Sequence, residues 1–326
     1  MNRAPRRSES GIALVAALAL IATAGLMAAT MVIIARVSTL HAVSFVDLMR
    51  SSYVAEGAAN RIRYLIEADR SVYGDSDAQT LDYDDYETDR YLADGSPHEI
   101  DYYGIPVKFT ITNGVSGYRI TGASDFDVFT SNRTDEALVT DAVTVFQNRY
   151  TDYEDEDDDV SEDGMEREDY ESYGWYNLPR NGSMQYREEL LWIPGSEDLL
   201  PPDADGRLSS IRHFRITESG NPSIYTATYA QLRTYAELDV EQAVNVLNAL
   251  RQWRLDRTPL EDLLTEETLS AVRSRFSFTE SEYYTVRIYQ TNADLRPGAR
   301  LLFTFQADGI GGPSSKVATF LEYFRF

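Results

Sequence analysis

The residues best suited to chemistry lie in one acidic run, DYEDEDDDVSEDGMEREDY, at positions 152–170. Within this run, Asp155, Asp157 and Asp159 occupy positions 1, 3 and 5 of a loop whose position 12 is Glu166. EF-hand loops supply oxygen ligands to calcium at this spacing, because the ion takes six to eight hard oxygens. The spacing therefore predicts a calcium site formed by carboxylates of the run.

These residues leave a second interpretation open. Position 6 of the loop is Val160, where an EF-hand has the glycine of its sharp turn, so a regular EF-hand is not expected. A block of like charges usually forms a solvated, self-repelling loop, and without a cation these carboxylates would hold the loop open. Asp152 is either a further ligand or a cap of the preceding segment.

No other group of residues has the spacing of a catalytic site. The chain has no cysteine, which excludes disulfides, thiolate metal sites and cysteine nucleophiles. Its histidines, His41, His98 and His213, lie in unrelated contexts, with no H-E-x-x-H, glycine-rich phosphate loop or G-x-S-x-G motif. The net charge of -23 argues against a nucleic-acid partner, which needs a basic face. We therefore expect a protein that is not an enzyme.

The elements that position the acidic run begin with an apolar segment. Residues 12–34 carry no charge and no proline, and about 23 helical residues cross a bilayer of roughly 30 Å. Arg3, Arg6 and Arg7 precede the segment and predict that its N-terminal end faces the cytoplasm. The rest of the chain would then lie outside the cytoplasm, in the periplasm of a Gram-negative bacterium.

Two fates of this segment are consistent with its pattern. Ala22-Thr23-Ala24 could be the cleavage site of a discarded secretory signal. However, apolar residues continue every three to four positions from Val37 to Leu65, which predicts one long helix that is retained, half in the membrane and half amphipathic.

The remaining pattern predicts an α+β domain. Residues 71–97 are polar and irregular, and residues 99–122 alternate around Asn113-Gly114, which predicts a hairpin turning at that pair. Helices are expected over 134–150, 186–195 and much of 224–275, followed by three strands within 283–326. If the early and late strands share a sheet, the helical block is an insertion.

The N-terminus resembles the type IV pilin and pseudopilin signal. In that family a prepilin peptidase cuts after a glycine, here Gly11, and methylates the new N-terminus, here Ile12. Most members carry Glu at the fifth mature position, where this chain has Ala16. The branch that lacks this Glu is the K-type minor pseudopilin of type II secretion.

The middle of the chain resembles the same K-type family. That family has D-W-x-D-x-D-D followed by G-A-E, and the chain has corresponding residues at 152–158 and 164–166, with Tyr153 for Trp and Met165 for Ala. Further family positions follow in order, namely Asn181, Glu189-Leu190, Gly195, Thr226-Ala227, 243–251 and 260–264. The Asn-x-Asn that usually precedes Thr-Ala is absent, because Ser223 and Tyr225 occupy those places.

The resemblance implies a pilin-like long N-terminal helix packed on an antiparallel sheet, with a large, mainly α-helical inserted domain. It divides the chain into a leader (1–11), the N-terminal helix (12–70, of which 12–35 is transmembrane), the first part of the pilin-like domain (71–132), the inserted domain (133–275) and the C-terminal strands (276–326). It also implies calcium, since K-type pseudopilins bind this ion in their inserted region.

The functional expectation is a non-catalytic minor pseudopilin at the tip of a type II secretion pseudopilus. Its partners would be the I- and J-type minor pseudopilins, the major pseudopilin, prepilin peptidase and inner-membrane lipid. A single-pass position in the bacterial inner membrane would precede assembly into the periplasmic pseudopilus. A minor pilin of a type IV pilus and a membrane-tethered periplasmic hydrolase or binding protein are the alternatives.

Overall fold

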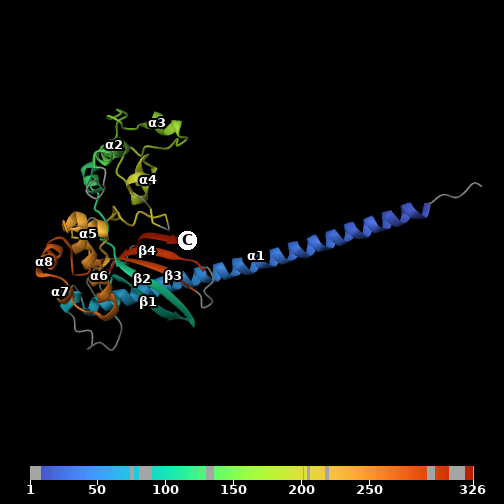
Figure 1. Ribbon diagram of the computed structural model, residues 1–326, viewed down its shortest axis with the longest axis horizontal. Helices are drawn as coiled ribbons and strands as arrows, with labels where there is room; N and C mark the ends of the chain where they lie inside the picture. The colour runs from blue at the N-terminus through green and yellow to red at the C-terminus, as the bar shows by residue number, and fades with distance from the viewer. Residues whose placement is uncertain are drawn as a thin grey trace, which may run out of the picture.

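The computed structural model describes residues 9–73, 77–80, 90–129, 136–200, 202–203, 206–216, 220–291, 298–307 and 320–325. Along these ranges the elements are α1 Glu9–Tyr73, η1 Ala78–Thr80, β1 Asp94–Tyr102, β2 Ile105–Asn113, η3 Ala123–Phe129, α2 Glu136–Glu154, α3 Arg167–Ser172, η4 Arg187–Trp192, α4 Ser196–Leu199, η5 Ile224–Thr226, α5 Tyr229–Tyr235, α6 Val240–Asp256, α7 Leu260–Leu263, α8 Glu266–Arg275, β3 Tyr283–Gln290, β4 Leu301–Gln306 and β5 Phe320–Arg325. The molecule is an α+β fold with one very long helix (Figure 1).

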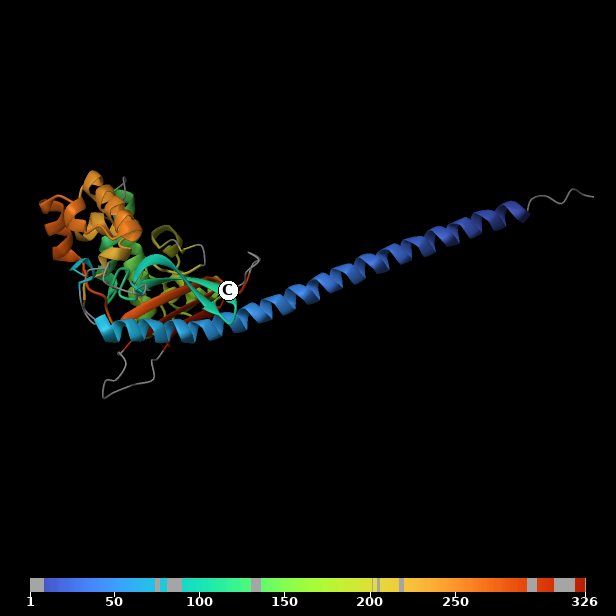
Figure 2. The same ribbon diagram turned by 90° about the horizontal axis from the view of Figure 1, so that it is seen from below.

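The long helix α1 is unbroken over 65 residues, or about 98 Å at 1.5 Å per residue. Its N-terminal half extends away from the rest of the chain in both views (Figures 1 and 2). From Ala13 onward the helix contains an 18-residue window of mean hydropathy 2.3, none of it buried, and no other helix in the described ranges is long and apolar enough to cross a membrane. The predicted long helix is confirmed, and its apolar half fits a single-pass membrane anchor.

The C-terminal half of α1 packs on the sheet. Its buried apolar residues recur on one face at helical spacing, and the three alanines among them let the helix approach the strands closely. They are Val54, Ala55, Ala58, Ala59, Ile62 and Ile66. They share one hydrophobic core with large side chains of the strands, among them Phe109, Phe303 and Phe305. This core fixes the helix against the middle of the sheet.

The sheet has five antiparallel strands in the order β1-β2-β3-β4-β5. Strands β2 and β3 are neighbours, with Ile111 opposite Val286, although residues 114–282 separate them in the sequence. The early and late strands therefore share a sheet, as predicted, and the segment between them is an insertion.

The predicted hairpin at Asn113-Gly114 is wrong. The hairpin turns at Tyr103-Gly104, between β1 and β2, and both residues have positive φ (52° and 79°), as this two-residue turn requires. The Asn113 side chain instead accepts hydrogen bonds from the Val115 amide at 3.0 Å and from the Ser281 hydroxyl at 2.6 Å. The Asn-Gly pair thus directs the chain out of the sheet and into the insertion.

The insertion has two hydrophobic cores of its own. One joins α2, η4 and the loops around them through residues such as Phe126, Phe146 and Leu190. The other joins η5 and α5–α8 around the fully buried Trp253. Figures 1 and 2 both place α5–α8 at the end of the molecule where α1 ends. The helices predicted within 224–275 are confirmed, including the cap of α6, where Asp239 accepts from the Gln242 amide at 2.8 Å.

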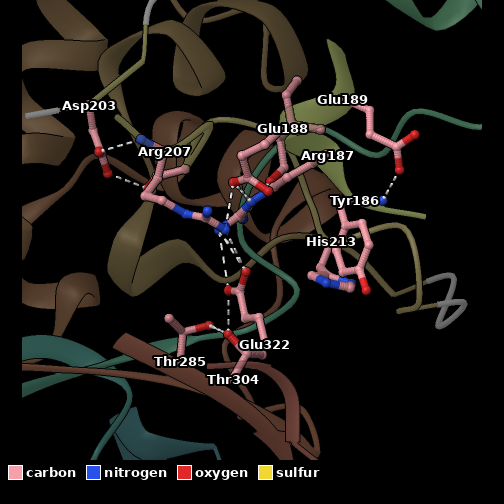
Figure 3. Close-up of polar contacts among 12 residues, drawn as sticks. Tyr186, Arg187, Glu188, Glu189, Asp203, Arg207, His213, Thr285, Thr304 and Glu322 are labelled. Carbon is pink, nitrogen blue, oxygen red and sulfur yellow. Dashed lines mark hydrogen bonds and ion pairs between the residues drawn. The ribbon is translucent and has the colours of Figure 1, made fainter. Parts of the chain in front are cut away.

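Buried ion pairs join the first core of the insertion to the sheet (Figure 3). Glu322 on β5 lies 3.3 Å from the Arg187 guanidinium and 3.2 Å from that of Arg207. Thr304 on β4 donates to the same carboxylate at 2.6 Å, and Glu188 lies 2.8 Å from Arg207. Burial lowers the pKa of Arg207, and the carboxylates of Glu188 and Glu322 oppose that effect. These contacts couple the insertion to the edge strand β5.

Candidate metal centre in the acidic loop

The acidic run begins inside a helix. Helix α2 continues to Glu154, so Asp152 lies on its last turn, and the chain then loops to Glu166, the residue before α3. Asp152 and Glu166 are buried and Asp155 is partly buried. The helix end and the return of the loop therefore bring carboxylates together that are 14 positions apart in sequence.

Three of the predicted ligands form a compact group. One carboxylate oxygen each of Asp152, Asp155 and Glu166 lies within 4.8 Å of the others. The second oxygen of Asp152, Oδ2, is already used, since it accepts from the amides of Met165 at 2.8 Å and Ser161 at 3.2 Å. These two hydrogen bonds hold the loop against the C-terminal end of α2.

Four other carboxylate oxygens of this group are buried and have no hydrogen-bond partner in the described part of the chain. They are Asp152 Oδ1, Asp155 Oδ1 and both carboxylate oxygens of Glu166. A buried acceptor without a donor destabilises the folded state. Neighbouring buried carboxylates destabilise it further, because their charges repel one another. A hard divalent cation would satisfy all four, so the residues present fit calcium.

The electrostatics of the group agree with this geometry. Burial, followed by the charges of Asp152 and Asp155, raises the pKa of Glu166 to about 7. The pKa of Asp155 is raised by burial and then by Asp157, Asp152 and Asp159. The site therefore disfavours its own ionised form, which is the form that a cation would stabilise.

The other two predicted ligands lie at the rim. Asp157 and Asp159 are exposed and are not in the compact group, and the Asp159 amide donates to the Asp157 carboxylate at 2.9 Å.

Asn181 supplies a contact to the acidic loop that the spacing of the carboxylates does not indicate. Its amide nitrogen lies 3.5 Å from the Asp157 carbonyl, and its Oδ1 is buried without a partner among the described residues. Its place in the family pattern, between the acidic run and Glu189, is the only sequence signal for it.

Gly164 is the residue whose size most constrains the loop. A Cβ at this position would lie within 1.9 Å of Asp152 Oδ2, the oxygen that holds the loop closed. We expect Gly164→Ala to displace Asp152, to weaken calcium binding by at least about tenfold, and to lower the melting temperature, as overpacking typically costs about 1–3 kcal/mol. Isothermal titration with calcium and thermal melting measure both effects.

Gly182→Ala is the matched control, because nothing lies within 4 Å of its added Cβ and its backbone is not in the left-handed region. It should leave calcium affinity unchanged. Equal calcium affinities in both variants would show that the position of Asp152 does not depend on the absence of a side chain at Gly164.

The predicted processing residues lie at the start of α1. Gly11 and Ile12 fall within the first turn of the described helix. Residues 1–8 of the predicted leader (1–11) lie outside the described residues. Cleavage after Gly11 stays a prediction.

Comparisons with known proteins identify the fold. No family model and no curated protein match the chain. Among solved structures, it is similar to a chain of the GspK-GspI-GspJ complex from the enterotoxigenic Escherichia coli type 2 secretion system, with a TM-score of 0.52 and 11% sequence identity. The similarity covers 87% of this chain and 98% of that one. The chain therefore has the fold of GspK, with a long apolar N-terminal helix and a five-stranded antiparallel sheet.

Proposed function

We propose that this chain is a K-type minor pseudopilin of a type II secretion system, with a structural rather than a catalytic role. The observation that carries the proposal is the GspK-like fold, which extends over most of both chains. The pilin-like leader and the acidic pattern at 152–166 support it independently, because both come from the sequence alone.

In this proposal α1 has two tasks. Its apolar half would hold the subunit in the bacterial inner membrane with the C-terminal region in the periplasm, since three arginines precede the apolar segment. Its amphipathic half would contact neighbouring pseudopilins, namely the I- and J-type subunits and the major pseudopilin. The exposure of α1 along residues 13–50 is consistent with this.

The place of the insertion supports a position at the tip. Helices α5–α8 lie at the membrane-distal end of α1 (Figures 1 and 2), where a subunit stacked above would have to fit. Such bulk is tolerated only by a subunit with nothing above it. Ala16 agrees, because the Glu that usually stands there is associated with docking onto a preceding subunit.

Calcium is the ion we propose for the acidic loop. Asp152, Asp155 and Glu166 would hold it, with Asp157 and Asp159 as further candidates at the rim. When bound, the ion supplies the positive charge that the buried carboxylates lack. The loop would then be fixed against α2 instead of being held open by repulsion.

Processing by prepilin peptidase gives the direct test of the pseudopilin route. We expect the mature protein isolated from its native membrane to begin at Ile12 and to carry a methyl group on that amine. Mass spectrometry of the N-terminal peptide measures both features. A mature protein that begins at Gly25, or that retains Met1, would contradict the proposal. The variant Gly11→Val should accumulate uncleaved and gives the reference mass.

A further inference from the structure

The loop that follows α3 exposes an unusual number of aromatic side chains. Residues 171–177 are all exposed, and they include Tyr173 (61% exposed), Trp175 (41%) and Tyr176 (73%). None of the three belongs to a hydrophobic core of the described chain. Clustered exposed aromatics are characteristic of interaction surfaces, where they provide most of the binding energy. We call these three residues the aromatic patch.

The aromatic patch is ordered by contacts that lead back to the acidic loop. The rings of Tyr173 and Trp175 are stacked, with centroids 5.7 Å apart. Trp175 also lies against the fully buried Tyr170 at 6.2 Å, and its amide donates to the Tyr170 carbonyl at 3.0 Å. Tyr170 in turn meets Tyr153 edge-on at 6.2 Å. Because Tyr153 directly follows Asp152, the acidic loop and the patch share one packed framework.

The surroundings of the patch are strongly negative. Residues 152–177 contain thirteen Asp and Glu residues and a single basic residue, Arg167. Glu168 and Glu171 are exposed beside the patch, and one bound divalent cation would leave most of this charge in place. A surface of this kind favours a cationic partner and disfavours acidic ones.

The position of the patch leaves it accessible. In Figure 1, α3 lies at the top of the insertion, apart from the sheet and from α1. The stretch of α1 proposed to contact other pseudopilins is therefore on a different part of the molecule. The patch is free to meet a partner from outside that helical packing.

We infer that Tyr173, Trp175 and Tyr176 form a docking surface for an arginine-rich segment of a partner protein, and that the calcium loop holds this surface in shape. Arginine fits better than lysine, because its planar guanidinium stacks on aromatic faces while it pairs with carboxylates. The ordering of the aromatic patch rests on the proposed calcium site. Recognition of arginine depends on the side chains of the patch itself.

The test uses the full-length processed protein in detergent with calcium, and two labelled peptides of equal length and charge that alternate Gly with Arg or with Lys. We expect the Arg peptide to bind at least about tenfold more tightly than the Lys peptide. The triple variant Tyr173→Ser, Trp175→Ser, Tyr176→Ser keeps every charge, and it should bring this ratio close to one. Tyr64→Ser, which removes another exposed tyrosine, is the matched control and should keep the full ratio.

An unchanged ratio in the triple variant would overturn the docking surface. Tight binding of a neutral chitooligosaccharide that is lost in the triple variant would also overturn it, because the patch would then be a sugar platform. Calcium binding is measured on the same samples by isothermal titration. Absence of calcium binding refutes the metal proposal by itself, whereas calcium binding without a preference for arginine refutes only the docking surface.

Discussion

Asp152→Asn combined with Glu166→Gln is expected to abolish calcium binding at the proposed site and, with it, the stabilisation that bound calcium would give. At a free calcium concentration 100 times the Kd, that stabilisation is about 2.7 kcal/mol. The same variant should be at least as stable as the wild type in EGTA, because Gln at 166 removes a buried carboxylate whose pKa is raised to about 7 by burial and by its neighbours. The double variant should therefore be at least as stable as the wild type in EGTA, whereas the wild type should be the more stable protein in calcium.

Asp159→Asn is the control for this experiment, because Asp159 is exposed and lies outside the compact carboxylate group. Its effect on calcium affinity should be clearly smaller than that of the double variant. Thermal melting of the wild type and both variants, with calcium and with EGTA, gives all six stabilities. A double variant that still gains stability from calcium would exclude Asp152 and Glu166 as the main ligands.

Removing Glu322 is expected to produce the second large effect. Glu322→Ala removes the more deeply buried of the two carboxylates that Arg187 and Arg207 share, leaving them with Glu188. It also removes the carboxylate to which Thr304 donates (Figure 3). Loss of one partner from a buried ion pair typically costs about 3–5 kcal/mol. We therefore expect a strong drop in the free energy of unfolding by urea at constant calcium.

Glu282→Ala provides the comparison, since Glu282 is exposed and contacts Gln306 at the surface. A change within about 0.5 kcal/mol is expected there, as for surface substitutions in general. If Glu322→Ala unfolded the insertion separately from the sheet, two transitions would replace one. If its cost matched that of Glu282→Ala, the buried pairs would not couple the two parts.

The elements that sequence reasoning located correctly are those with strong periodicity. The apolar run and its continuation predicted α1, and alternation predicted β3 at residues 283–290. The hairpin was missed because Tyr103-Gly104 lacks the Asn or Asp that usually starts such a turn. Asn113-Gly114 carries the usual signal, but the Asn113 side chain bonds to Ser281, 168 positions away, a tertiary contact that no local pattern contains.

The candidate site also contains some features that the sequence pattern indicates and others that only the fold reveals. Spacing placed Asp155, Asp157, Asp159 and Glu166 in one loop, but it could not show that Asp152, on the last turn of α2, joins Asp155 and Glu166 in one compact group. The extent of α2 decides this, and helix ends are poorly defined in an acidic sequence. The buried Asn181 Oδ1 depends on the return of the chain after α3, which is likewise a tertiary feature.

Co-purification with I- and J-type minor pseudopilins is the most direct test of the proposed K-type role. The processed full-length chain would be co-expressed with the I- and J-type subunits of its own organism and purified in detergent through a tag on the J-type subunit. We expect the three chains to elute together in equal amounts, and we expect this chain to join a filament of the major pseudopilin only at one end. Recovery of the I- and J-type subunits without this chain, in the presence of calcium, would rule out the proposed K-type role.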